Sequence, residues 1–127
     1  MEGKIRILLV DDERDYVEIL SMWLGEKGYK IFSAYNGREV TAALKENPVD
    51  IIFLDLHMPY ADGIYALREI RKLHPKLPVI LVTAFPEDPA VAKASALGID
   101  GLFPKNGGLD QLTGLIQVAI RTHKDPP

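Results

Sequence analysis

Residues 51–56 read Ile-Ile-Phe-Leu-Asp-Leu, and residues 79–83 read Val-Ile-Leu-Val-Thr. Each stretch is apolar over four consecutive residues, without the alternation that is typical of a strand with one face in water. Continuous runs of this kind indicate strands buried on both faces, as in a parallel sheet covered by helices on each side. The two stretches therefore predict the centre of an α/β fold.

Five apolar runs recur along the chain and alternate with segments of helical periodicity. The runs lie at 5–10, 30–34, 49–56, 78–83 and 101–103. Apolar residues in the segments between them repeat every three or four positions, as in amphipathic helices. Strict alternation predicts a flavodoxin-like, doubly wound (βα)5 fold of the α/β class. Its five-stranded parallel sheet is expected in the common order 2-1-3-4-5.

Two of the helix starts carry recognisable capping patterns. Asn36 precedes Glu39 by three residues, which is the spacing of a capping box. Asp88 followed by Pro89 predicts a cap and the first position of an Ala-rich helix that reaches Leu97. The last helix is predicted from the apolar stripe between Leu109 and Ile120.

The composition restricts the class of protein. A chain of 127 residues with 47% hydrophobic and 26% charged residues is expected to form one ordinary globular domain. The absence of cysteine excludes disulfides and thiolate chemistry. A net charge of -3 gives no electrostatic footprint for direct contact with nucleic acid or an anionic membrane. No signal-peptide core or membrane-length apolar run is present, so we expect a cytoplasmic protein.

Polar side chains occur where the predicted strands end. Asp11 and Asp12 follow the first strand, and Asp55 ends the third. Thr83 ends the fourth strand, and the fifth leads into Lys105. Because the strands are parallel, these positions meet at one edge of the sheet, where ligands bind at the switch point between strands 1 and 3. Three carboxylates, a hydroxyl and an ammonium are thus expected to converge.

Each of these residues also has a purely structural interpretation. Asp12 could cap a helix that starts near Glu13, and Asp55 could be a turn residue after a buried strand. Thr83 is β-branched and suits a strand, and Lys105 could be a solvated loop lysine. Taken separately these interpretations suffice, but they do not explain why four strand ends carry complementary polar groups.

The convergence indicates a specific chemistry. Crowded carboxylates raise each other's pKa unless a cation neutralises them. Mg²⁺ is the natural cation, since it binds one or two carboxylates, keeps several waters and bridges to phosphate oxygens. A carboxylate beside the metal can attack phosphorus and form an aspartyl phosphate. The sequence therefore favours phosphoryl transfer to a carboxylate at this edge.

At these positions the chain resembles the receiver domain of two-component response regulators. The resemblance spans nearly the whole chain and rests on four motifs. These are ILLVDDE at 7–13, DLHMPYADG at 55–63, VILVTA at 79–84 and ALGIDGLFPK at 96–105. The resemblance implies a receiver domain over residues 1–122, followed at 123–127 by a polar tail or the start of a linker.

The resemblance also implies a role for each site residue. Asp55 would be the phosphoacceptor, and the donor would be a phosphohistidine on a sensor histidine kinase or a histidine phosphotransfer protein. Thr83 would follow the phosphoryl group, and Lys105 would pair with its oxygens. The chain would act as a switch rather than a turnover enzyme, and its downstream output partner or domain is unknown.

The same resemblance implies the ligands of the metal. Asp12, Asp55 and the backbone carbonyl of His57 would bind Mg²⁺, and Asp11 would contribute through water. The side chain of His57 has two interpretations: an exposed loop residue, or a group that tunes hydrolysis of the acyl phosphate by contacting the attacking water.

Two positions depart from the family pattern. Leu102 stands where many receivers carry a Tyr or Phe that moves inward on activation, and strand alternation points the neighbouring Phe103 to the opposite face. We therefore predict no aromatic switch in the fifth strand. Asn106 replaces the usual proline after Lys105, so a trans peptide bond is expected there.

Other functions compete with phosphoryl acceptance. A phosphorylation-independent receiver-like module that binds a protein remains an alternative on the same fold. A phosphatase of the Asp-x-Asp type is disfavoured because residue 57 is His rather than Asp. A nucleotide or flavin site is disfavoured because no glycine-rich loop follows the first strand. The sequence fits either a stand-alone receiver or relay component or one domain of a longer regulator.

Overall fold

The computed structural model describes residues 4–58 and 63–124. Strands and helices alternate throughout this part of the chain. The elements are β1 (Arg6–Val10), α1 (Arg14–Glu26), β2 (Lys30–Ala34), α2 (Gly37–Glu46), β3 (Ile51–Leu54), α3 (Gly63–Leu73), β4 (Val79–Thr83), α4 (Pro89–Leu97), β5 (Gly101–Pro104) and α5 (Asp110–Lys124).

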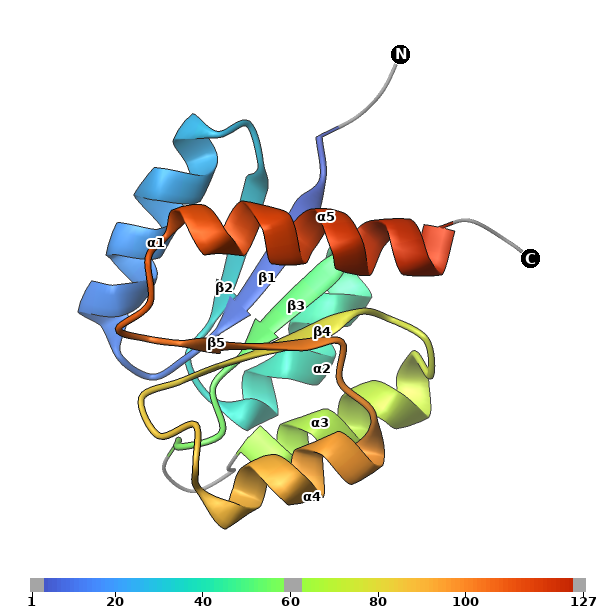
Figure 1. The fold of residues 1–127 in the computed structure, drawn as a ribbon. Coiled ribbons are helices and arrows are strands. Elements are labelled where there is room, and N and C mark those ends of the chain that lie inside the picture. Colours follow the sequence, from blue (N-terminus) through green and yellow to red (C-terminus); the bar gives the residue numbers. More distant parts are fainter. Residues whose placement is uncertain (1–3, 59–62, 125–127) are drawn as a thin grey trace.

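The strands form one parallel sheet in the order β2-β1-β3-β4-β5, which confirms the predicted topology (Figure 1). Val10 of β1 lies beside Leu54 of β3, and Thr83 of β4 lies beside Pro104 of β5. The carboxyl ends of these four strands are therefore level at one edge of the sheet.

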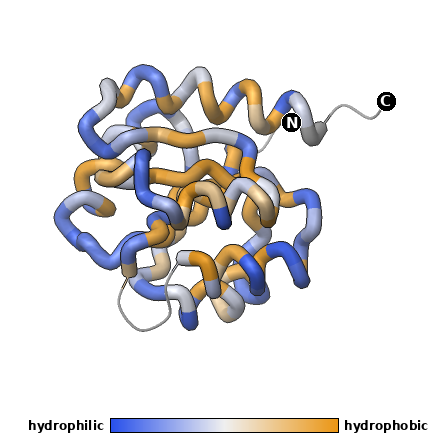
Figure 2. The backbone as a smooth tube through the Cα atoms, turned by 60° about the horizontal axis from the view of Figure 1, so that its bottom comes forward, coloured by the Kyte–Doolittle hydropathy of each residue, from blue (hydrophilic) through white to orange (hydrophobic). Residues whose placement is uncertain are grey.

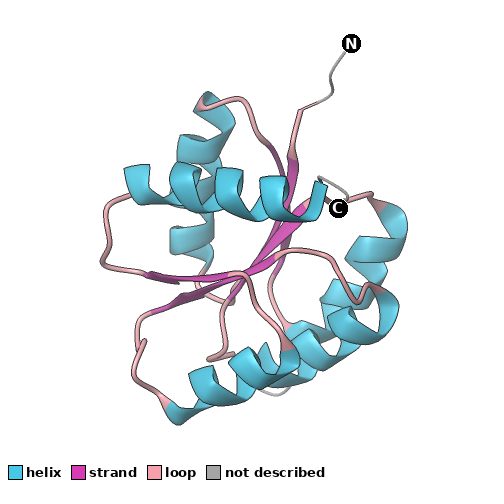
Figure 3. Cartoon of the chain, turned by 45° about the vertical axis from the view of Figure 1, so that its right-hand side comes forward, coloured by secondary structure: helices cyan, strands magenta, loops and turns pink. Residues whose placement is uncertain are grey.

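Helices cover both faces of the sheet, as the continuous apolar runs predict (Figures 1 and 3). The side chains of α1 and α5 pack on one face with the buried residues Ile7, Leu9, Ile51, Phe53, Ile80, Val82 and Phe103. Those of α2, α3 and α4 pack on the other face with Leu8, Val10, Ile52, Leu54, Val79 and Leu81. Neighbouring residues of β1, β3 and β4 thus alternate between two apolar layers. Figure 2 shows these hydrophobic strands in the middle of the molecule.

Both predicted helix caps are present. The side chain of Asn36 accepts hydrogen bonds from the backbone amides of residues 38 and 39, while Glu39 accepts one from the amide of Tyr35 at 2.8 Å. Asp88 caps α4 by accepting from the amide of Ala90 at 2.7 Å. These contacts satisfy donors that the first helical turn leaves free.

The end of the chain differs from the prediction. Helix α5 continues to Lys124, so the first part of the segment expected to be a tail is helical. No glycine or proline between Ile120 and Lys124 interrupts the helix, which explains the extension. Residues 125–127 lie outside the described part. Among the described residues, no helix is both long enough and apolar enough to cross a bilayer.

Arg71 connects the carboxyl ends of α3 and α4. Its guanidinium donates two hydrogen bonds to the carbonyl of Gly98, at 3.1 and 2.8 Å, and one to that of Leu77 at 2.8 Å. A further bond reaches the carbonyl of His74 at 3.2 Å. Gly98 has a φ of 105°, a left-handed conformation that disfavours other residues. The carboxyl end of α4 is thereby fixed to α3 and the following loop.

Candidate functional site

Backbone hydrogen bonds continue the sheet beyond the strand ends and hold the predicted site residues in place. The amide of Asp55 donates to the carbonyl of Val10 at 2.9 Å, and that of Asp11 donates to the last residue of β2 at 3.1 Å. The amide of Lys105 donates to the carbonyl of Thr83 at 2.8 Å. The site is therefore built on the sheet itself rather than on free loops.

Three carboxylates meet at the switch point. Asp11, Asp12 and Asp55 each place an oxygen within 4.8 Å of the others. Asp11 and Asp55 are each only 4% exposed. The N-cap of α1 is Glu13, whose amide donates to the Asp11 carboxylate at 3.0 Å, and no side chain caps it in the usual way. The interpretation of Asp12 as the helix cap is therefore wrong.

Lys105 lies among the carboxylates. Its Nζ is 2.9 Å from Asp11 Oδ2 and 3.5 Å from Asp55 Oδ2, and it also forms an ion pair with Glu13. Burial lowers the pKa of Lys105, but the hydrogen bonds to Asp11 and Glu13 outweigh this effect and raise it above its ordinary value. The ammonium stays charged, and Lys105 is not a solvated loop lysine.

The surroundings of Asp55 disfavour the ionised form of its carboxyl group. Burial and the nearby charge of Asp11 raise the pKa of Asp55 to about 6, against the opposing effects of the His57 amide and Lys105. The His57 amide donates to Asp55 Oδ1 at 3.1 Å. A buried acid beside a like charge favours either a proton or a cation. Neutralisation by a cation would therefore stabilise the ionised form of Asp55.

Thr83 ends β4 with a side chain that is completely buried. Its hydroxyl oxygen accepts a hydrogen bond from the amide of Phe85 at 2.9 Å. This bond closes a turn at the start of the loop between β4 and α4. The predicted hydroxyl therefore lies at the same sheet edge and is engaged by its own loop.

The ring of His57 reaches across to the start of α4. His57 Nε2 lies 2.9 Å from Oδ2 of Asp88, the residue that caps α4. The ring also meets Phe85 edge to face, with centroids 5.2 Å apart. Hydrogen bonds from the Ala90 amide and from His57 lower the pKa of Asp88. The backbone of His57 lies beside Asp55 while its ring contacts the β4–α4 loop.

The positions that depart from the family pattern lie as predicted. Leu102 packs with the α2–α4 layer, whereas Phe103 is buried in the α1–α5 layer on the opposite face. No cis peptide bond occurs in the described residues, so the bond between Lys105 and Asn106 is trans. The absence of an aromatic switch in β5 stays a prediction.

Three residues at the site have no role predicted from the sequence: Glu13, Tyr16 and Gly63. Glu13 pairs with Lys105, and the ring of Tyr16 lies against the same ammonium, with its centroid 4.8 Å from Nζ. Glu13 and Tyr16 are three residues apart at the start of a helix, and residues with this spacing lie on the same face. The spacing could therefore have indicated that both approach the same partner. Gly63 opens α3 so close to Leu56 that a Cβ would lie 2.3 Å from the Leu56 Cα.

The parallel (βα)5 sheet, with carboxylates, a hydroxyl and an ammonium at the switch point, defines the class of flavodoxin-like receivers. The sequence model of the response regulator receiver domain family matches residues 7–117 of this chain, and the chain belongs to this family. It is similar to the transcriptional regulatory protein ZraR of Salmonella typhimurium, with 32% identity over 120 residues. That match covers 94% of this chain but only 27% of ZraR.

Solved structures show the same relationship. A two-component response regulator from Clostridium difficile is 28% identical, with a TM-score of 0.88 over 96% of this chain and 100% of that one. The response regulator TrrA from Thermotoga maritima, in complex with Mg²⁺-BeF, is 32% identical. Its TM-score is 0.79 over 91% of this chain and 98% of that one.

Proposed function

We propose that this receiver domain accepts a phosphoryl group on Asp55 from a phosphohistidine of a sensor histidine kinase or a histidine phosphotransfer protein. The position of Asp55 carries the proposal. It is a buried carboxylate at the switch point, placed between two further carboxylates and an ammonium. Family membership supports the same role, because receivers as a class are phosphoacceptor switches.

The proposed phosphoryl transfer needs no reactant besides Asp55 and the phosphohistidine. A carboxylate oxygen of Asp55 forms a bond to phosphorus while the bond between phosphorus and the donor imidazole nitrogen breaks. The leaving nitrogen keeps the bonding electron pair. Asp55 must be ionised to attack, and with a pKa of about 6 it is largely ionised at pH 7.5. The product is an acyl phosphate on Asp55.

The donor set fits Mg²⁺, which takes oxygen ligands and would offset the burial and the repulsion by Asp11 that raise the pKa of Asp55. Asp12, Asp55 and the backbone carbonyl of His57 would hold the ion, with Asp11 acting through water. When bound, the ion neutralises charge on the carboxylates and on the phosphoryl oxygens. The complex of the similar regulator TrrA with Mg²⁺-BeF supports Mg²⁺ as the ion.

Phosphorylation would bias an existing two-state equilibrium. The added oxygens offer new partners to Lys105 and to the hydroxyl of Thr83, which now accepts from the Phe85 amide. Turning Thr83 toward the phosphoryl group would pull the β4–α4 loop inward. A complete reversal, from 1:99 to 99:1, needs roughly 5.5 kcal/mol of differential interaction.

ZraR is much longer than this chain. The chain spans 27% of the length of ZraR, so the activities of such longer regulators are not carried over to it. We propose that residues 1–122 act as the receiver unit, either alone or joined to another domain, in the cytoplasm where a kinase can reach it. It would accept phosphate stoichiometrically rather than turn over a substrate.

Intact-mass analysis tests the proposal. The protein is incubated with Mg²⁺ and a small-molecule phosphodonor, and Asp55→Asn serves as the control. We expect a single phosphoryl adduct on the unsubstituted chain, dependent on Mg²⁺, and none on Asp55→Asn. An unsubstituted chain without an adduct would overturn the proposal in favour of a phosphorylation-independent binding module.

A further inference from the structure

Tyr16, in the first turn of α1, has an unusual hydroxyl group. It is the one buried side-chain polar atom, within the part of the chain that the structure describes, that lacks a hydrogen-bond partner. A buried polar group without a partner costs free energy, and an apolar side chain of the same shape would avoid that cost. The hydroxyl therefore does not account for an aromatic residue at this position.

The ring of Tyr16 has a clear contact. Lys105 Nζ lies 4.8 Å from the ring centroid, within the range in which an aromatic face attracts a cation. Burial raises the pKa of Tyr16 to about 12, so the ring is neutral at physiological pH. The attraction is therefore that of a neutral π face for an ammonium, not that of a phenolate.

We propose that Tyr16 is a positioning residue for phosphoryl transfer, whose ring face holds the Lys105 ammonium between Asp11 and Asp55. This inference rests on the proposed role of Asp55 as phosphoacceptor. It assigns to the first turn of α1 a part in the reaction that none of the site carboxylates can supply.

The electrostatics of the site favour a neutral partner for Lys105. The lysine stem is flexible, and its ammonium is drawn to Asp11 at 2.9 Å and to the exposed Glu13, while Asp55 is farther away at 3.5 Å. Another carboxylate would fix the ammonium but would repel an incoming phosphoryl group. An aromatic face attracts the ammonium without adding net negative charge. The ring therefore restrains Lys105 without repelling the incoming phosphoryl group.

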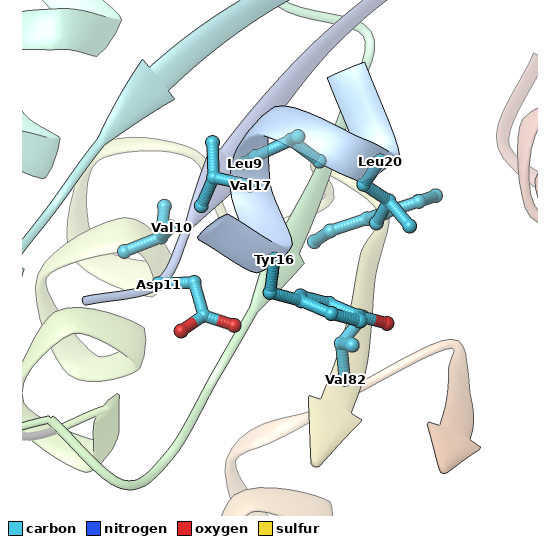
Figure 4. Close-up of a pocket in the computed structure, with 8 residues that line it drawn as sticks. Leu9, Val10, Asp11, Tyr16, Val17, Leu20 and Val82 are labelled. Carbon is cyan, nitrogen blue, oxygen red and sulfur yellow. The ribbon is translucent and has the colours of Figure 1, made fainter. Parts of the chain in front are cut away.

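Packing holds the ring in place. Figure 4 shows Tyr16 between the start of α1 and the end of β4, with Val82 beside the ring and the Asp11 carboxylate to one side. The space next to the ring has a volume of about 10 Å³, which is too small for a ligand. Its lining is mostly aliphatic, including Leu9, Val17 and Leu20. A ring packed in this way gives Lys105 a fixed surface.

Three substitutions at one position separate the ring face from mere bulk. Tyr16→Phe keeps the face, Tyr16→Leu removes it, and Tyr16→pentafluorophenylalanine keeps the shape but inverts the ring charge distribution. Tyr29→Leu is the matched control, because Tyr29 packs against the same apolar layer but precedes β2, at the opposite edge of the sheet. Phosphorylation rates are measured with a small-molecule phosphodonor and Mg²⁺.

We expect Tyr16→Phe to react within twofold of the unsubstituted chain. The Leu and pentafluorophenylalanine variants should react roughly three- to tenfold more slowly, as expected for loss of a cation–π contact. Tyr29→Leu should react at the unsubstituted rate. Equal rates for the pentafluorophenylalanine variant and Tyr16→Phe would overturn the inference, even if the Leu variant failed to fold.

An NMR measurement tests the contact without the reaction. The ε-methylene protons of Lys105 should resonate upfield in the unsubstituted chain and in Tyr16→Phe, because they adjoin the ammonium that lies over the ring. The upfield shift should disappear in Tyr16→Leu, and Lys105→Arg identifies the signal. No upfield shift in the unsubstituted chain would overturn the inference. No adduct on the unsubstituted chain would overturn the phosphoacceptor role instead, so the two failures are distinguishable.

Discussion

Replacing the proposed phosphoacceptor should stabilise the protein. Asp55 is 4% exposed and faces the charge of Asp11, so its ionised form is disfavoured in the folded state. Asparagine has nearly the same shape, carries no charge and can still accept the hydrogen bond from the His57 amide. The variant Asp55→Asn therefore removes repulsion while keeping the local hydrogen bond.

The size of the effect follows from the pKa of Asp55, which rises from 3.8 to about 6 on folding. A shift of this size corresponds to roughly 3 kcal/mol of destabilisation once the group is ionised. The opposing attraction of Lys105, 3.5 Å from Asp55, is already included in this net shift. We therefore expect Asp55→Asn to raise the free energy of unfolding at pH 7.5 by roughly 1–3 kcal/mol in the absence of Mg²⁺.

The pH dependence has a definite sign. Between pH 3.8 and about 6 the folded state binds more protons at Asp55 than the unfolded state does. Stability contributed by the protonated group is therefore present below pH 3.8 and is lost as the pH rises through about 6. The advantage of Asp55→Asn over the unsubstituted chain should thus grow over this interval and level off above it.

Urea unfolding at several pH values, with a chelator present, measures the difference. Asp110→Asn is the control, because it removes one charge from an exposed residue at the start of α5. The control should show no gain in stability. The reasoning is refuted if Asp55→Asn has the same advantage at pH 4 as at pH 7.5, or no advantage at either.

Three further predictions concern the metal, the α3–α4 junction and the lifetime of the phosphorylated state. Mg²⁺ at a hundredfold excess over its Kd should add roughly 2.7 kcal/mol to the free energy of unfolding, and most of this gain should vanish in Asp12→Asn when thermal melts are compared. Arg71→Met should cost about 2–4 kcal/mol in urea unfolding, because the carbonyls of Gly98 and Leu77 lose their donor. Arg71→Lys should recover only part of this loss. His57→Asn should change the lifetime of the acyl phosphate in a chase measured by intact mass, and an unchanged rate would remove the hypothesis that His57 tunes hydrolysis.

The order of the strands and the convergence of the polar groups could be predicted from the sequence. Both depend on backbone features that short motifs specify, such as the buried runs ending at Asp11 and Asp55. Parallel strands bring their carboxyl ends to one edge whatever the loops do. The caps at Asn36 and Asp88 were equally predictable, because a cap is defined within a few residues.

The contacts between side chains from distant segments could not be predicted. His57 and Asp88 are 31 residues apart, and their hydrogen bond depends on where the β4–α4 loop places Asp88. The contact of Tyr16 with Lys105 depends in the same way on how α1 leaves β1. Hydrophobic periodicity predicts that Tyr16 lies on the apolar face of its helix. It does not predict which cation lies over the ring.

Helix α4 is held very differently at its two ends. At its carboxyl end Arg71 binds Gly98 twice, whereas at its amino end Asp88 is joined to His57 by a single hydrogen bond between side chains that are about one-third exposed. Between the two ends, Ala94 is the one fully buried residue of α4, and Ala90, Val91 and Leu97 are partly buried against the core. A displacement of the β4–α4 loop would therefore move the amino end of α4 more than its carboxyl end, which Arg71 holds at Gly98. The movement would thus be largest beside the carboxyl edge of the sheet, where β4 ends.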